Sequence, residues 1–380
     1  MNIGIVCYPT YGGSGVVATE LGMALAEKGH GIHFVTSHQP VKLNFLNRNL
    51  HFHEVFVERY PLFHYQPYSL ALSSKLVETV QKYDLDVLHV HYAIPHAYAA
   101  YMAKLMLREK GVDIPIVTTL HGTDITLVGS HPVYKPAVEF SINHSDAVTT
   151  VSESLKRDTI RLFDITKEIE VIYNFIDFEH KESWTDEDCV RNTLASPEEK
   201  ILTHVSNLRP VKRVLDVIRI FQKVQERIPS KLILVGEGPE KEKAVLLAQD
   251  LGVKEKILFL GKSDEIRKIL CFSDLFLLPS ETESFGLAGL EAMAARTPVI
   301  STNTGGLPEV NVQGVSGFLS DVGDVEDMAR NAIYILEDEQ RLESFKNNAY
   351  EVAKKFSMDR ILPKYEEMYR RVIRNAAKVL

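Results

Sequence analysis

Strand-like and helix-like patterns alternate along two successive stretches of this chain. In the first stretch, short apolar runs of strand length are separated by segments with apolar residues at three- and four-residue spacing. The expected strands span residues 3–7, 32–36, 55–57, 87–90, 116–120, 147–151 and 171–173. The expected helices span residues 16–28, 73–82, 97–109, 134–143 and 153–163. This alternation needs right-handed crossovers and predicts a parallel sheet with helices on both faces.

The alternation resumes after a polar stretch, residues 180–200, which contains the single Trp and has the composition of a linker or surface excursion. The expected strands here span residues 201–205, 232–235, 257–260, 275–278, 299–301 and 317–319. The expected helices span residues 213–228, 240–251, 264–272, 285–295, 325–336 and 340–355. Because 380 residues exceed the usual size of one core, we expect two doubly wound α/β domains, residues 1–178 and 179–359.

The final segment, residues 359–380, is predicted to form one long helix rich in Arg and Lys. Its apolar stripe consists of Ile361, Tyr365, Met368, Tyr369 and Ile373. A basic amphipathic helix can lie on a membrane surface, and packing across the domain junction explains the stripe equally well. We expect this helix, about residues 360–380, to pack back on the N-terminal domain.

Composition excludes several classes of protein. No segment approaches the roughly 20 apolar residues of a membrane helix, and the N-terminus enters a strand pattern without a secretory signal, so we expect a cytoplasmic enzyme without stable membrane insertion. The three cysteines are too few and too scattered for a disulfide scaffold or a Cys-based zinc site. A net charge of -8 argues against nucleic acid as a partner, so an anionic substrate needs a local basic cluster.

Two glutamates flank the start of the helix expected at residues 285–295. Glu283 lies in the loop that feeds this helix, and Glu291 is expected about two turns into it. The start of a helix offers free backbone N–H groups and a positive dipole end, which suit a pyrophosphate. Glu291 can then accept hydrogen bonds from ribose hydroxyls, and Glu283 can reach a hexose hydroxyl. A solvated helix with two surface glutamates is the alternative.

Arg209 and Lys212 lie in the loop after the strand expected at residues 201–205. Two cations beside a helix N-terminus oppose the dipole preference, and a diphosphate would explain their position. Arg would bind phosphate oxygens in a bidentate manner and Lys would add a point charge. A solvated basic turn is the alternative. The glycine turns Gly236-Glu237-Gly238 and Gly305-Gly306 follow neighbouring strands and either approach a ligand or simply turn the chain.

The first half carries a second candidate anion site at Gly12-Gly13-Ser14-Gly15, between the first expected strand and a helix opening at Val16. The stretch also fits a dinucleotide pattern, but the loop is long and no acidic residue follows the second strand, which argues against a nicotinamide or flavin site. A purely structural turn remains open.

His121 ends the strand at residues 116–120 and is expected to project toward a ligand. His89 and His91 should share one strand face, but no third ligand lies near in sequence, so we interpret them and His96 as structural. Asp84-Leu85-Asp86 precedes a strand and is interpreted as a helix-terminating turn.

Four motifs occur in order along the chain: the Gly12 to Gly15 turn, His121-Gly122-Thr123-Asp124, Arg209 with Lys212, and Glu283 with Glu291. Together they resemble the retaining glycosyltransferases of family four, across essentially the whole chain. That family has the GT-B fold, in which two doubly wound Rossmann-like domains face a central cleft. The runs at residues 13–21, 89–96, 120–129 and 173–177 are similar to members that join N-acetylglucosamine (GlcNAc) to L-malate in the first step of bacillithiol biosynthesis.

The resemblance implies that the C-terminal domain binds the donor UDP-GlcNAc and the N-terminal domain the acceptor L-malate. It implies no cofactor and no obligatory metal, and it leaves a homodimer open. The donor-binding residues would be Arg209, Lys212, Glu283, Glu291 and the backbone of Phe285, Gly286 and Leu287. The catalytic residues would be His121, beside the anomeric carbon, with Glu283, Arg209 and Lys212.

The resemblance also implies which residues face the acceptor. They are Gly13, Ser14, Tyr92, Thr119 and Asn174. Lys135, Lys156 and Arg157 are candidates to pair with the second malate carboxylate, and the sequence does not choose among them.

The residues also bear on the mechanism. No pair of acids is evident at glycosidase separations, and His121 is a poor covalent nucleophile. Our hypothesis is therefore retention by front-face return, in which the enzyme supplies electrostatics and positioning. The alternatives are a family-four enzyme with another small acceptor, a UDP-GlcNAc epimerase, and a non-catalytic nucleotide-sugar-binding protein.

Overall fold

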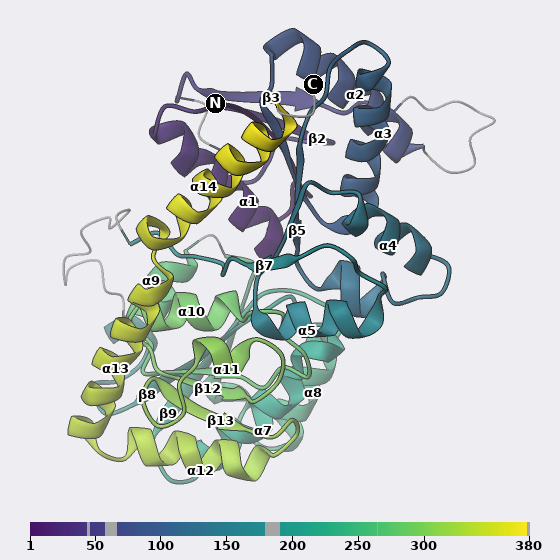
Figure 1. Ribbon diagram of the computed structural model, residues 1–380. Coiled ribbons are helices and arrows are strands. Elements are labelled where there is room, and N and C mark those ends of the chain that lie inside the picture. The colour runs from purple at the N-terminus through teal and green to yellow at the C-terminus, as the bar shows by residue number, and fades with distance from the viewer. Residues whose placement is uncertain (44–45, 58–66, 179–190, 264, 378–380) are drawn as a thin grey trace. The chain divides into compact units, whose positions relative to one another are not determined.

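The computed structural model describes residues 1–43, 46–57, 67–178, 191–263 and 265–377. The chain forms two compact units, one made of Met1–Asn174 with Asp359–Leu380 and the other of Phe175–Met358 (Figure 1). The sequence prediction places the domain boundary at residue 178. In the structure, the first stretch of the first unit ends at Asn174, and the unit also includes the C-terminal segment from Asp359. Residues 179–190, which hold most of the expected linker and the single Trp, lie outside the described residues.

In the described part of the first unit, a parallel sheet of seven strands has the order β3-β2-β1-β4-β5-β6-β7. The strands are β1 (Asn2–Val6), β2 (Gly31–Thr36), β3 (Leu50–Glu54), β4 (Val87–His91), β5 (Ile116–Leu120), β6 (Ala147–Thr150) and β7 (Ile169–Val171). The helices are α1 (Gly13–Glu27), α2 (Tyr68–Tyr83), α3 (Tyr98–Arg108), α4 (Lys135–Asn143), α5 (Glu153–Leu162) and α14 (Met358–Ala376), with short turns η1 (Ala93–Ala97) and η2 (Thr123–Leu127).

In the described part of the second unit, a parallel sheet of six strands has the order β10-β9-β8-β11-β12-β13. The strands are β8 (Lys200–Val205), β9 (Ser230–Val235), β10 (Ile257–Gly261), β11 (Leu275–Leu278), β12 (Val299–Thr302) and β13 (Gly317–Ser320). The helices are α6 (Arg191–Leu194), α7 (Val214–Gln225), α8 (Lys241–Asp250), α9 (Ile266–Cys271), α10 (Leu287–Ala294), α11 (Leu307–Val310), α12 (Val325–Leu336) and α13 (Glu339–Ala353), with short turns η4 (Pro210–Lys212), η5 (Lys254–Lys256) and η6 (Lys354–Phe356).

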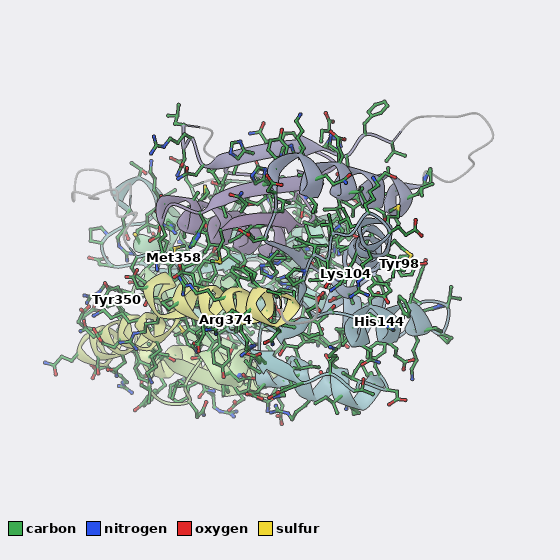
Figure 2. All side chains as sticks on the ribbon, turned by 45° about the horizontal axis from the view of Figure 1, so that its top comes forward. Tyr98, Lys104, His144, Tyr350, Met358 and Arg374 are labelled. Carbon is green, nitrogen blue, oxygen red and sulfur yellow. The ribbon has the colours of Figure 1, made fainter. Side chains whose placement is uncertain are left out.

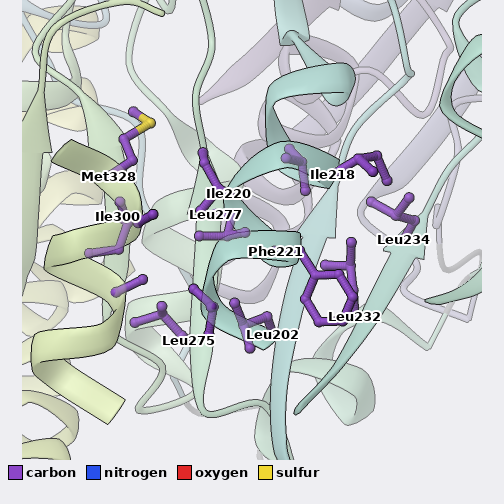
Figure 3. Close-up of a cluster of buried hydrophobic side chains, with 14 of the residues drawn as sticks. Leu202, Ile218, Ile220, Phe221, Leu232, Leu234, Leu275, Leu277, Ile300 and Met328 are labelled. Carbon is purple, nitrogen blue, oxygen red and sulfur yellow. The ribbon is translucent and has the colours of Figure 1, made fainter. Parts of the chain in front are cut away.

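The interior of the second unit explains why its strands contain runs of apolar residues. Strand residues such as Leu202, Leu232 and Leu277 pack against Phe221 of α7 and Met328 of α12 (Figure 3). A second cluster, which includes Ile233 and Phe272, packs around other side chains of the same sheet. Strands of a parallel sheet that carries helices are buried on both faces and therefore have continuous apolar runs instead of alternating ones.

Helix α14 packs into the first unit, so intramolecular packing accounts for its apolar stripe. Tyr365 and Tyr369 are almost completely buried, and the Tyr369 hydroxyl lies 2.7 Å from Nδ1 of His89 on β4. Glu366 forms an ion pair with Lys28 and lies 2.9 Å from Nε2 of His30, both beyond the end of α1. Figure 2 labels Met358 and Arg374 near the two ends of this helix. No helix within the described residues is long and apolar enough to cross a membrane.

Most predicted elements are confirmed, with shifts of a few residues, but the strand expected at residues 55–57 is wrong. The strand is β3 at Leu50–Glu54, at the edge of the sheet. His51 and His53 alternate with its apolar residues, and both rings stack on His33 of the neighbouring strand β2. Two histidines thus occupy one face of β3, and the prediction, which searched for apolar runs, missed this strand.

Smaller corrections concern the ends of elements. The strand expected at residues 171–173 is β7, Ile169–Val171, and Lys200 belongs to β8 instead of to a linker. The helix expected from Val16 begins at Gly13, while the start of the helix expected at 264 lies outside the described residues. Asp84 has the left-handed backbone of a helix C-cap, which confirms the expected turn.

Two glycine turns hold the loops at the carboxyl edge of the second sheet. A Cβ added at Gly236 would lie 1.7 Å from the carbonyl oxygen of Ser206, in the loop after β8. A Cβ added at Gly305 would lie 1.9 Å from the carbonyl oxygen of Glu283, in the loop after β11. Both glycines also have positive φ angles. The turns therefore bring backbone against backbone, which only glycine permits here.

We expect Gly305→Ala to destabilise the protein more than Gly314→Ala. Both positions have a left-handed backbone, which costs alanine about 1–2 kcal/mol, but Gly314 has open space where a Cβ would lie. Gly305→Ala must in addition displace the backbone of Glu283, with an expected further cost of about 1–3 kcal/mol. Urea unfolding followed by circular dichroism measures the difference, and equal midpoints for the two variants would contradict the close approach.

Candidate functional site

Candidate site residues of both units lie where the strand order of the sheet reverses, while Thr119 and His121 lie on or after β5 and Asn174 lies after β7. In the first unit the reversal lies between β1 and β4, and in the second it lies between β8 and β11. Successive crossovers leave such a point in opposite directions, which opens a crevice at the carboxyl ends of the two strands, where doubly wound sheets bind ligands. Ser14 follows β1 and Tyr92 follows β4, while Lys212 follows β8 and Glu283 follows β11.

In the second unit an ion pair spans the reversal. The ammonium of Lys212 donates to Oε1 of Glu283, and the hydroxyl of Ser280 donates to the same oxygen over 3.0 Å. The Lys212 and Glu283 side chains are 22% and 14% exposed, so both retain access to solvent. The structure thus brings together two of the predicted donor-binding residues, which are separated by about seventy positions in the chain.

The backbone fixes the two loops that carry this pair. The N–H of Glu281 donates to the carbonyl of Val211 over 2.8 Å, which ties the loop after β11 to the turn η4. The Thr302 hydroxyl donates to the carbonyl of Ser280, and the N–H of Gly306 donates to that of Glu283. Lys212 and Glu283 are therefore held by their main chains before any ligand arrives.

A buried histidine that the sequence prediction missed joins the two strands beneath the pair. His204 of β8 donates from Nδ1 to the carbonyl of Leu277 on β11 over 2.8 Å, while its Nε2 lies 2.8 Å from the Ser206 hydroxyl. Burial lowers the pKa of His204 to about 4, and the charge of Lys212 acts in the same direction. A neutral histidine can thus connect both strand ends without adding charge to the site.

The remaining predicted donor residues lie in the same two loops and in α10. Arg209 is exposed and precedes η4, between two residues with left-handed backbone, Leu208 and Arg213. Helix α10 begins at Leu287 after Gly286, whose φ is 95°. The Phe285 side chain is buried against Phe356, so only its backbone is suited to face a ligand, as predicted. Glu291 is partly exposed a little over one turn into the helix, instead of the two turns expected.

In the first unit a hydrogen bond of 2.6 Å between the Ser14 and Tyr92 hydroxyls spans the corresponding reversal. Ser14 lies in the first turn of α1, where Gly13 is exposed, and this helix has no side-chain N-cap. Tyr92 has a φ of 85°, a strained angle for a non-glycine residue, and its N–H donates to the carbonyl of Thr119. Burial raises the pKa of Tyr92 to about 12, which keeps its hydroxyl protonated.

Asp124 organises the turns after β4 and β5, a role that the sequence prediction missed. Its buried carboxylate accepts backbone N–H groups of Ala93, His121 and Gly122 over 2.9, 3.2 and 3.0 Å. Burial raises the pKa of Asp124 to about 6, and these hydrogen bonds act against that rise. Asp124, the last residue of the His-Gly-Thr-Asp motif, thus fixes the backbone of His121, the first residue of that motif.

His121 follows β5 directly, as predicted, and is almost buried. Its Nε2 lies 2.8 Å from Nδ1 of His91 on β4. Burial lowers the pKa of His121 to about 3. His89 and His91 share one face of β4, as expected, with ring centroids 4.4 Å apart. In the part of the chain that the structure describes, no group of three His, Cys, Asp or Glu residues is arranged to hold a metal ion.

The other predicted acceptor residues differ in how they are placed. The Thr119 hydroxyl is buried and hydrogen-bonded to His89 and Thr149, so internal partners already occupy it. Asn174 is 7% exposed, and its Oδ1 has no hydrogen-bond partner among the described residues.

The three candidate bases for the second acceptor carboxylate lie on two helices. Lys135, at the start of α4, pairs with Glu139 over 3.8 Å. Lys156 and Arg157 lie in α5, which Ser152 caps. No ion pair of Lys156 or Arg157 is present within the described ranges, although Glu153 and Asp158 lie on the same helix.

Sequence comparison relates both halves of the chain to glycosyltransferases. Glycosyltransferase Family 4 matches residues 11–180, and Glycosyl transferases group 1 matches residues 186–352. The chain is 48% identical to the N-acetyl-alpha-D-glucosaminyl L-malate synthase of Bacillus anthracis, over 99% of this chain and 98% of that protein. It is 30% identical to the glycogen synthase of Mycobacterium tuberculosis, over 70% of this chain and 64% of that protein.

Structural comparison gives the same fold. The crystal structure of Anabaena HepE in complex with UDP and glucose matches 98% of this chain and 100% of its own, with a TM-score of 0.83 and 20% identity. Sucrose-phosphate synthase from Thermosynechococcus elongatus matches 98% of this chain and 99% of its own, with a TM-score of 0.80 and 19% identity. The chain therefore belongs to glycosyltransferase family 4 and is a glycosyltransferase with the GT-B fold.

Proposed function

We propose that this glycosyltransferase transfers GlcNAc from UDP-GlcNAc to the hydroxyl of L-malate, with retention of configuration and without an obligatory metal. This reaction would begin bacillithiol biosynthesis. The observation that carries the proposal is the 48% identity to a synthase of that name over almost the full length of both chains. The polar pair at each strand-order reversal supports it, because each pair suits one of the two substrates.

The donor side would be the Lys212–Glu283 pair with its neighbours. Lys212 and the exposed Arg209 would neutralise the diphosphate, and Glu291 would accept hydrogen bonds from the ribose. Glu283 would accept a hydrogen bond from a GlcNAc hydroxyl while it stays paired with Lys212. The start of α10 would add backbone N–H groups to the β-phosphate.

The acceptor side would be the first turn of α1 with Tyr92. Backbone N–H groups at Gly13 and Ser14 suit a carboxylate, because the start of α1 lacks a side-chain cap. Asn174, whose side-chain oxygen has no partner among the described residues, would also face the acceptor. Lys156 and Arg157, which form no ion pair within the described ranges, are better candidates for the second carboxylate than Lys135, which already pairs with Glu139.

The mechanism would follow from these charges. The bond between the anomeric carbon and the β-phosphate oxygen breaks, and Arg209 and Lys212 stabilise the negative charge that develops on the leaving UDP. A short-lived oxocarbenium ion forms, and the malate hydroxyl attacks it on the face from which UDP departs. The hydroxyl proton passes to the departing phosphate oxygen, so the new bond has the configuration of the old one.

Incubation of the purified chain with UDP-GlcNAc, with and without L-malate, tests the function. We expect UDP and an α-linked GlcNAc-malate product only when both substrates are present, as measured by chromatography and NMR. EDTA should leave the rate unchanged, and L-lactate, which lacks the second carboxylate, should be a poor acceptor. An altered hexose without UDP release would indicate an epimerase, and UDP-GlcNAc binding without turnover would indicate a binding protein.

Glu291→Ala should weaken the handling of the donor. Loss of a charge-assisted hydrogen bond of about 1.5–3 kcal/mol corresponds to a roughly tenfold to more than hundredfold loss in kcat/KM for UDP-GlcNAc. Glu281→Ala is the matched control, because Glu281 is exposed and contributes its backbone N–H to the loop. Equal kinetics for the two variants would remove Glu291 from the site.

Lys212→Ala should lower kcat more than it weakens donor affinity. If Lys212 stabilises charge mainly in the transition state, its loss should lower kcat by about a hundredfold. Lys243→Ala is the control, because Lys243 is a lysine of the same unit that is 65% exposed and pairs with Glu240. A rise in KM with unchanged kcat would assign Lys212 to ground-state binding only.

A further inference from the structure

The contact between His91 and His121 connects two neutral imidazoles. His91 Nδ1 and His121 Nε2 lie 2.8 Å apart, and both side chains are buried. Burial lowers the pKa of both rings, that of His121 to about 3. A neutral imidazole has one N–H donor and one bare nitrogen acceptor. One of the two facing nitrogens must therefore carry the proton, and the other must accept it in a hydrogen bond.

The opposite side of the His91 ring decides which nitrogen donates. Nε2 of His91 is buried and has no hydrogen-bond partner among the described residues. If His91 carried its proton there, a buried N–H group would be left without an acceptor. Unpaired buried N–H groups are rarer than unpaired acceptors, and they cost the full desolvation of a donor. The proton of His91 therefore belongs on Nδ1, where it is donated to Nε2 of His121.

The neighbouring His96 supports this assignment. Its Nδ1 lies 2.6 Å from the backbone carbonyl of His91, and a carbonyl oxygen only accepts, so His96 carries its proton on Nδ1. Its Nε2 is likewise buried without a partner among the described residues, and it must be a bare acceptor. This part of the first unit thus tolerates an unpaired imidazole lone pair.

We propose that His91 is a positioning residue that holds His121 in the tautomer with its proton on Nδ1. With Nε2 engaged by His91, His121 can only donate a hydrogen bond from Nδ1 and cannot act as a base there. The catalytic meaning of this tautomer rests on the proposed function. His121 would donate a hydrogen bond to a hydroxyl of the transferred sugar. This role suits the proposed mechanism, in which no histidine accepts or delivers a proton.

The surroundings of His91 hold its ring in place. His91 is the last residue of β4 and pairs in register with Thr119 of β5. The ring of His89 packs against it, and both nitrogens of His89 are occupied, one by the Tyr369 hydroxyl of α14 and one by the Thr119 hydroxyl, each over 2.7 Å. A continuous chain of contacts thus extends from α14 through His89 and His91 to His121.

Histidine-selective ¹⁵N labelling with long-range NMR correlation tests the tautomer directly, without substrate. The His121 resonances are assigned by their absence in His121→Ala. We expect a protonated Nδ1 and a bare Nε2 in the wild type and in His91→Asn, because the Asn side-chain N–H₂ can occupy the position of His91 Nδ1. His91→Leu should lose this preference and show a mixture of tautomers. A wild-type His121 protonated on Nε2 would overturn the proposal.

Kinetics of the same variants test whether the positioning of His121 by His91 matters for the transfer reaction. We expect kcat with UDP-GlcNAc and L-malate to fall about tenfold in His91→Leu, with the donor KM little changed and most of the rate restored in His91→Asn. His33→Leu is the matched control, because it removes a 2.9 Å contact between His33 and His53 elsewhere in the same unit. Equal losses in His91→Leu and His91→Asn would reduce His91 to a packing role.

The two readouts separate the proposals. If the tautomer is as expected but no GlcNAc-malate forms, the proposed function fails and the positioning of His121 stands. If GlcNAc-malate forms but the wild-type tautomer is the other one, the positioning of His121 fails alone.

Discussion

The reversal of strand order in each parallel sheet is the constraint on which the site depends. At a reversal, the loops that follow two adjacent strands run in opposite directions, so no crossover connection covers the polar groups at the carboxyl ends of these strands. In both units a polar contact bridges these ends, Ser14 with Tyr92 in the first and Lys212 with Glu283 in the second. The apolar core fixes the position of the strands, and the bridging pair supplies polar groups that can contact a ligand in the crevice.

The two pairs differ in a way that fits two different tasks. The pair in the second unit is ionic, partly exposed and surrounded by backbone contacts through glycine turns, and it suits a polyanionic ligand. The pair in the first unit is neutral, and the histidines beside it are neutral as well, because burial depresses their pKa values.

Local patterns predicted much of this architecture. The strands β5 and β11 and the helix α12 have the predicted bounds, because each is an uninterrupted apolar or amphipathic segment. The edge strand β3 was missed because histidines replace apolar residues on one of its faces. The positions of Lys212 and Glu283 beside helix starts, together with the resemblance to a known family, predicted both residues. The contact of His91 with His121 and the three N–H groups bound by Asp124 instead depend on distances between segments, which spacing along the chain does not contain.

The return of α14 to the first unit has a consequence for biosynthesis. Tyr365 and Tyr369 complete the interior of a unit whose other residues end at Asn174. Ribosomes make the chain from its N-terminus, so the entire second unit is made before these two tyrosines exist. The N-terminal part of the first unit therefore keeps an apolar surface uncovered during synthesis, and it reaches its final packing only after α14 has been made.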